Sequence, residues 1–153
     1  MQATIENLEK ILGNYSVRLG AVTEEVYTHQ PGPGKWSKKE ILGHLVDSAQ
    51  NNIRRFVVAQ YEEVPFIAYD QDKWVALANY RHYPTRDLVS LWLLLNRHIV
   101  QVLAAIPPQG AGRKCATSST HEPYTLEWLA ADYCNHLLHH LHQILDLDPI
   151  AYP

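Results

Sequence analysis

The chain has 153 residues, 46% of them hydrophobic, and its 13 basic and 16 acidic side chains give a net charge of −3. This length predicts one domain over residues 1–153 with a sizeable core. Because charges of both signs are mixed along the chain, we expect no nucleic-acid-binding surface and no surface for anionic membranes. Two cysteines are too few for a disulfide scaffold, and no stretch resembles a signal peptide or approaches the roughly 18 apolar residues of a membrane span. We therefore expect a cytoplasmic protein.

Apolar residues recur at helical spacing in four long stretches, and no convincing alternating strand is present. The expected helices span residues 3–19, 38–62, 85–106 and 125–148. This pattern predicts an all-α protein, specifically a four-helix bundle.

Three of these helices begin with side chains suited to capping. Ser37 and Glu40 have the spacing of a capping box, and Thr85 and Thr125 are candidate caps for the last two helices. The helix over residues 85–106 is apolar nearly all round, which indicates either burial on several sides or a homodimer interface.

Residues 65–84 form a long crossover between the second and third helices, with one short helix expected over residues 73–79. The segment is rich in aromatic residues. A connection of this length in a compact domain is commonly a lid or a pocket wall. An aromatic crossover that simply packs on the bundle is the equal alternative.

Four histidines lie within seven positions of the last helix. At 100° per residue, His136, His140 and Gln143 fall within an arc of about 60°. A histidine pair four residues apart on one face can hold one metal ion. His139 lies at the edge of this arc, and His142 points away from it and is expected to be exposed.

A third ligand is expected from the second helix. There His44, Ser48, Asn51 and Arg55 form a polar stripe separate from the apolar one. Such a stripe is more often a solvated face than a site, but the later histidine pair favours a metal site. Asp47 lies three residues after His44, near enough to hydrogen-bond its ring or a bound water.

Three histidines with a vacant fourth position are typical of a catalytic metal ion, whereas structural zinc takes four protein ligands. The ion, zinc, nickel or manganese, would activate a water or bind a thiolate. We expect Asp47, Asn51 and Gln143 to orient the ligands or handle protons. Leu137 stands where the H-E-x-x-H motif requires glutamate, which excludes that metalloprotease class. A surface histidine cluster or a core network is the alternative.

Two separated motifs resemble those of the DinB/YfiT-like superfamily. They are Trp36-Ser-x-x-Glu-x-Leu-Gly-His-Leu-x-Asp-Ser48, continuing through Asn51 to Arg55-Phe56, and Asn135-His-Leu-Leu-His-His-Leu-His-Gln-Ile144. The segment Tyr69-Asp-Gln-Asp-Lys-Trp74 resembles the connecting segment of the family. The resemblance covers nearly the whole chain. It implies a four-helix bundle, often a homodimer, that holds a divalent metal by three histidines corresponding to His44, His136 and His140.

The resemblance also implies two kinds of activity. Members of the family include transferases and isomerases that use a low-molecular-weight thiol (bacillithiol, mycothiol or glutathione), and others are described as metal-dependent hydrolases. We therefore expect a metal-dependent enzyme with a small-molecule substrate. The alternatives are a metal-binding stress protein without turnover and a helical dimerisation module with an incidental histidine cluster.

Overall fold

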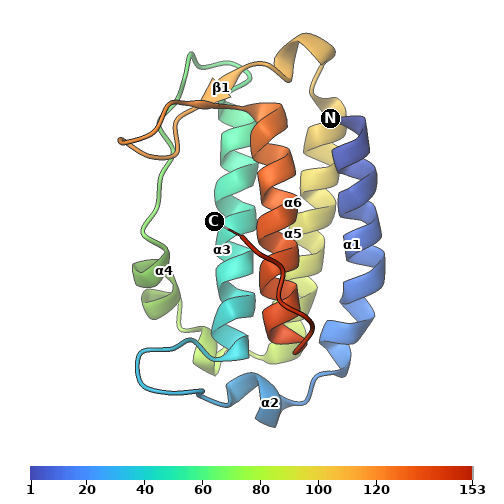
Figure 1. Cartoon of the computed structure of the whole chain (residues 1–153), viewed down its shortest axis with the longest axis vertical. Coiled ribbons are helices and arrows are strands. Elements are labelled where there is room, and N and C mark those ends of the chain that lie inside the picture. The colour runs from blue at the N-terminus through green and yellow to red at the C-terminus, as the bar shows by residue number, and fades with distance from the viewer. Residues whose placement is uncertain (153) are drawn as a thin grey trace.

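Four long helices form the body of the protein, and the computed structural model describes residues 1–152 (Figure 1). The long helices are α1 (Gln2–Ala21), α3 (Lys38–Val58), α5 (Thr85–Ala105) and α6 (Leu126–Ile144). The shorter helical elements are α2 (Glu24–Thr28), α4 (Gln71–Leu77), η1 (Tyr80–His82) and η2 (Pro108–Gly110). Two-residue strands β1 (Lys114–Cys115) and β2 (Tyr124–Thr125) pair antiparallel in the loop before α6. The predicted all-α four-helix bundle is confirmed.

Each long helix packs on two others, so that α3 and α1 both contact α5 and α6. Figure 1 shows that α3 and α5 run in the same direction, opposite to α1 and α6. Parallel helices that follow one another in the chain need a connection as long as the bundle itself. Residues 59–84 make this return, with α4 packed outside α3. The predicted long crossover is therefore present, and it passes along the outer side of α3.

The bundle core is built from one apolar stripe of each long helix. On α5 the stripe consists of Leu88, Trp92, Ile99 and Leu103, all almost fully buried at helical spacing. Val100 is buried as well, and the remaining apolar side chains of this helix are half-buried or exposed, as Leu94 is at 60%. The helix is therefore buried on one side, and its outer face is mixed, with Leu94 exposed among polar side chains such as Arg97 and Gln101.

By length and composition α5 could also span a membrane, with a mean hydropathy of 1.5. This differs from the sequence-based expectation that no stretch approaches such a span. The helix packs against α1 and α3 within the bundle, and the core helix of a soluble protein meets the same criterion.

Two of the predicted helix caps are present. The Ser37 amide donates to Glu40 Oε2 at 2.9 Å, and the Glu40 amide donates to Ser37 Oγ at 3.3 Å, which completes the capping box. Thr125 Oγ1 accepts from the Trp128 amide at 3.2 Å. These caps fix the starts of α3 and α6, the two helices that carry the histidines.

Three predicted boundaries were wrong, one of them the end of α6, which lies at Ile144 rather than at residue 148. Thr85 is not a cap, because Pro84 holds that position and the Thr85 hydroxyl donates to Glu24 instead. Helix α3 ends at Val58 rather than near residue 62. Beyond this end, Arg113 donates to the backbone carbonyls of residues 59 and 62, so these groups are satisfied without a further helical turn.

Candidate metal centre

The polar stripe of α3 faces the inside of the protein. His44 is 1% exposed, Ser48 and Asn51 are buried as well, and Arg55 is half-buried. The stripe is turned toward α6 and the crossover, because His44 contacts His136 and Arg55 donates to the Ile67 carbonyl. The alternative of a solvated face is therefore wrong.

The structure brings His44, His136 and His140 together. The Nε2 atoms of His44 and His136 lie 3.0 Å apart. One nitrogen from each of the three rings lies within 4.8 Å of the other two. Ligands bonded to one tetrahedral zinc ion at about 2.0–2.1 Å are roughly 3.4 Å apart, so the spacing fits a single ion held between α3 and α6.

The three imidazoles are in the form that binds metal. Burial, with a smaller effect of His140, lowers the pKa of His44 to about 3. Burial together with the neighbouring histidines lowers the pKa of His136 to about 2, and burial also lowers the pKa of His140. All three rings are therefore neutral near pH 7, each with a lone pair available to a metal ion.

A hydrogen-bond chain fixes which nitrogen of His140 is free. His140 Nδ1 donates to Gln143 Oε1 at 2.8 Å, and Gln143 Nε2 donates to His139 Nε2 at 2.9 Å. His139 Nδ1 in turn donates to the Ile150 carbonyl at 2.6 Å. Since Nδ1 of His140 carries the proton, its Nε2 keeps the lone pair. Gln143 thus orients His140, in the way that outer partners orient metal-bound histidines.

The other two histidines lack such a partner. Nδ1 of His44 and Nδ1 of His136 are buried with no hydrogen-bond partner among the described protein atoms. Asp47, which the sequence places beside His44, instead accepts a hydrogen bond from the Tyr80 hydroxyl. Asn51 donates to the Asp47 carbonyl at 2.9 Å, within α3. Of the three expected supporting residues, only Gln143 contacts a candidate ligand through a hydrogen bond of the structure.

Asp47 is electrostatically unusual. It is 1% exposed, and its Oδ2 atom has no partner in the described structure. Burial raises its pKa to about 6, against the opposing effect of the Tyr80 hydrogen bond. This carboxyl group therefore changes charge close to neutral pH.

Gly43 allows Tyr80 to reach Asp47. A Cβ atom at residue 43 would lie 2.2 Å from Tyr80 Cδ2, so the ring occupies the space of the missing side chain. The glycine beside the first candidate ligand thus lets η1 of the crossover pack directly on α3.

Aromatic rings enclose the histidines on two sides. The Trp36 ring lies 5.1 Å from the ring of His44, measured between centroids, and the Tyr152 ring lies 5.2 Å from that of His136. Tyr152 belongs to the segment after α6, which turns back along that helix (Figure 1). It is held there by a bond from its hydroxyl to Asp132 Oδ2 at 3.0 Å.

His142 contributes to this turn rather than to the cluster. The helical spacing predicts that His142 is exposed. It is half-buried instead, because the segment after α6 covers it. Its Nδ1 donates to the Asp148 carbonyl at 2.7 Å, and its Nε2 accepts from the Tyr15 hydroxyl at 2.8 Å.

A polar cavity of about 170 Å³ opens beside His136. Tyr69 and Gln71 of the crossover line it, so the crossover forms one wall. A second cavity of about 480 Å³ lies next to it, on the side of the loop before α6. The side chains that line both cavities are Arg55, Asp132 and Tyr152.

The sequence analysis assigned no role to Asp132 or Tyr152. Asp132 precedes His136 by four residues, so helical spacing already places it on the same face. No such signal exists for Tyr152, because its position depends on the turn after α6.

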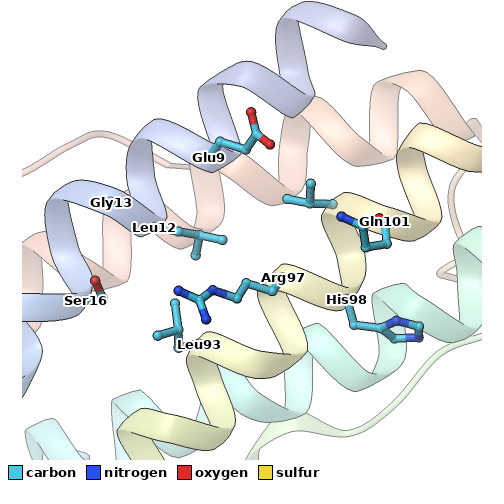
Figure 2. Close-up of a pocket in the computed structure, with 9 residues that line it drawn as sticks. Glu9, Leu12, Gly13, Ser16, Leu93, Arg97, His98 and Gln101 are labelled. Atoms are coloured by element: carbon cyan, nitrogen blue, oxygen red, sulfur yellow. The ribbon is translucent and has the colours of Figure 1, made fainter.

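A cavity of about 530 Å³ lies elsewhere, between α1 and α5 (Figure 2). Arg97 and His98 line it, and Figure 2 shows both on α5. His98 belongs to no group of metal-binding side chains in residues 1–152.

The chain matches the model of the DinB superfamily over residues 7–144. It is 26% identical over 144 residues to the Bacillus subtilis protein named "Putative metal-dependent hydrolase YfiT", which covers 94% of this chain and 81% of that protein. Two Oceanobacillus iheyensis proteins named in the same way are 27% and 30% identical over 109 and 105 residues. These matches cover 66% and 68% of this chain, and 62% and 59% of the two proteins.

The fold agrees with these matches. A solved structure of Bacillus subtilis YfiT is described as a probable metal-dependent hydrolase with an unusual four-helix bundle topology. It resembles this structure with a TM-score of 0.85 at 25% identity, covering 95% of this chain and 83% of that one. With the sequence match extending over nearly all of the bundle, this chain belongs to the DinB superfamily.

Proposed function

We propose that this protein is a metal-dependent enzyme in which His44, His136 and His140 hold one divalent transition metal ion, zinc or nickel, with manganese as a third candidate. The observation that carries the proposal is the convergence of three neutral imidazoles beside a polar cavity. Within residues 1–152, no cysteine, carboxylate or further histidine joins this group. Three protein ligands are typical of a catalytic ion, whereas a structural ion takes four.

The bound ion would lower the pKa of a water molecule or a thiol at the open position, as metal ions do in other sites of this kind. The residues of the chain would supply orientation and proton transfer. Gln143 keeps the lone pair of His140 Nε2 free. Asp47 can hold or release a proton near neutral pH, and Asn51 ties its side chain to the backbone of Asp47.

For the reaction, we propose hydrolysis or transfer to a low-molecular-weight thiol, with a small-molecule substrate. The names of the relatives favour hydrolysis. The small polar cavity beside His136 favours a small substrate over a macromolecule. The hypothesis that the ion only joins two helices is weaker, because a structural metal ion typically has its fourth coordination position filled by a protein ligand.

Elemental analysis of protein purified without a histidine tag tests the metal centre. We expect about one equivalent of zinc, nickel or manganese per chain. Loaded protein is then screened against ester and amide substrates, and against electrophiles with bacillithiol, mycothiol or glutathione. Turnover that disappears on metal removal supports the proposal, and protein that binds no divalent metal overturns it.

We further propose that the protein is a cytoplasmic homodimer that associates through the outer face of α5. The support is a small leucine cluster on this face, where Leu94 is 60% exposed beside half-buried Leu91 and Leu95. Sedimentation equilibrium of wild type and of Leu94→Glu tests the dimer. A monomer at all concentrations would contradict it.

A further inference from the structure

Arg55 is a half-buried cation at the wall of both cavities beside the histidines. Its Nε donates to the Ile67 carbonyl at 3.1 Å, and its Nη1 donates to Asn52 Oδ1 at 3.4 Å. A guanidinium has five N–H donors, so these two bonds leave three for other partners. No carboxylate forms an ion pair with Arg55 in the described part of the chain.

The carboxylate of Asp132 shares the two cavities but, in the residues that the structure describes, forms no ion pair with Arg55. Asp132 lines the same two cavities, but its Oδ2 accepts a hydrogen bond from Tyr152 at 3.0 Å. A cation shielded from water is unfavourable unless it is paired. Asp132 balances part of the charge of Arg55 without forming an ion pair within residues 1–152, and Arg55 keeps free donors that an anionic ligand can accept from.

We propose that Arg55 binds a carboxylate of the substrate, so that another part of the same molecule lies at the three-histidine centre. Guanidinium and carboxylate form two parallel hydrogen bonds, which fix orientation as well as charge. The cavity that contains Arg55 also contains His136. One small molecule can therefore contact both.

The two cavities define the size of this molecule. The 170 Å³ cavity has room for a carboxylate with a short chain. The 480 Å³ cavity adds Tyr124 and Trp128, whose rings stack with centroids 4.0 Å apart. This aromatic wall suits an apolar or aromatic group. The substrate class is thus a small carboxylate that carries such a group.

The assignment of the reacting end rests on the proposed function, but carboxylate binding does not. The test therefore uses the full chain in metal-free and metal-loaded form, titrated with 3-phenylpropionate and with the neutral 3-phenylpropionamide. Binding is followed by NMR through the Nε–H signal of Arg55 and the backbone amides of the cavity walls. We expect the carboxylate to shift the Arg55 signal in both forms, and to bind about tenfold or more tightly than the amide.

The variants are Arg55→Met, Arg55→Lys and, as a matched control, Arg54→Met, which removes an exposed arginine from the same helix. We expect Arg55→Met to weaken 3-phenylpropionate binding about tenfold or more, Arg55→Lys to weaken it less, and Arg54→Met to leave it unchanged. If Arg55→Met fails to fold, Arg55→Lys and the wild-type Arg55 signal still decide the question.

Three results would overturn this inference. The first is equal binding of acid and amide, and the second is an Arg55 signal that does not shift in saturated wild-type protein. The third is carboxylate binding that occurs only in the metal-loaded form and is unchanged in Arg55→Met. The last result would show that the carboxylate is a ligand of the ion. Binding to wild-type protein that takes up no metal would instead refute the proposed function and leave the Arg55 site standing.

Discussion

Replacement of His136 by alanine should abolish metal binding while leaving the bundle folded. The ring is only partly buried, its Nδ1 has no partner, and its Nε2 faces that of His44 at 3.0 Å. In the metal-free protein these two neutral imidazoles form at most one hydrogen bond with each other, so removal of the His136 ring loses little hydrogen bonding. We expect His136→Ala to change the free energy of unfolding of the metal-free protein by about 1 kcal/mol.

The effect on the metal-loaded protein should be much larger. A ligand at a free concentration of 100 times its Kd stabilises the folded state by about 2.7 kcal/mol. For a chain of this length, each 1 kcal/mol shifts the Tm by about 2–4 °C. Wild type should therefore gain about 5–10 °C on metal loading. His136→Ala loses one of three ligands and should gain almost nothing at the same metal concentration.

The assay is thermal unfolding of tag-free, chelator-treated protein with and without added zinc or nickel, followed by circular dichroism. His98→Ala is the matched control, because this histidine lies on α5 at the cavity between α1 and α5 (Figure 2). We expect the control to keep the full wild-type shift. A similar shift in His136→Ala, or none in wild type, would refute the reasoning.

The remaining predictions concern the surroundings of the histidines. Gly43→Ala places a Cβ 2.2 Å from Tyr80 Cδ2 and should lower the free energy of unfolding by about 1–3 kcal/mol in urea titrations. The pKa of Asp47 rises on folding from 3.8 to about 6, so its ionisation opposes folding increasingly from about pH 4 and fully above about pH 6. Asp47→Asn should therefore stabilise by up to about 3 kcal/mol at pH 7.5, with the gain vanishing below about pH 4, in urea titrations at several pH values. Gln143→Met removes the acceptor that orients His140 and should weaken metal affinity about 10–100-fold in a chelator competition assay.

Matched controls exist for all three changes. Gly13→Ala in α1 meets no atom within 4 Å and should stabilise slightly. Asp87→Asn changes an exposed carboxylate, and Gln50→Met changes an exposed glutamine on α3. A stable Gly43→Ala protein, a pH-independent effect of Asp47→Asn, or equal metal affinity in the Gln143 and Gln50 variants would each contradict the argument concerned.

The features that the sequence predicts well depend on local spacing. Helical periodicity places His136 and His140 on one face of α6, and the capping box of Ser37 and Glu40 sets the start of α3. With the second helix starting there, His44 falls on its inner polar stripe. Within a bundle in which α3 and α6 are neighbours, these positions lie close enough to meet.

The features that it does not predict depend on how distant segments return to the site. Tyr80 reaches Asp47 because the crossover runs back along α3, and Tyr152 reaches His136 because the chain turns after α6. His142 is covered by the same turn. None of these contacts follows from residues close in sequence, so no periodicity could predict them.

Helix α3 carries two stripes with opposite effects on stability. Its apolar stripe, with Leu42, Leu45 and Phe56 fully buried, holds the bundle together. Its polar stripe buries His44, and Asp47 lies next to it with a carboxylate oxygen that has no partner. Groups of this kind destabilise a fold unless something pairs with them. A sequence under selection for stability alone would favour apolar residues there, so this local conflict indicates a functional site independently of the family likeness.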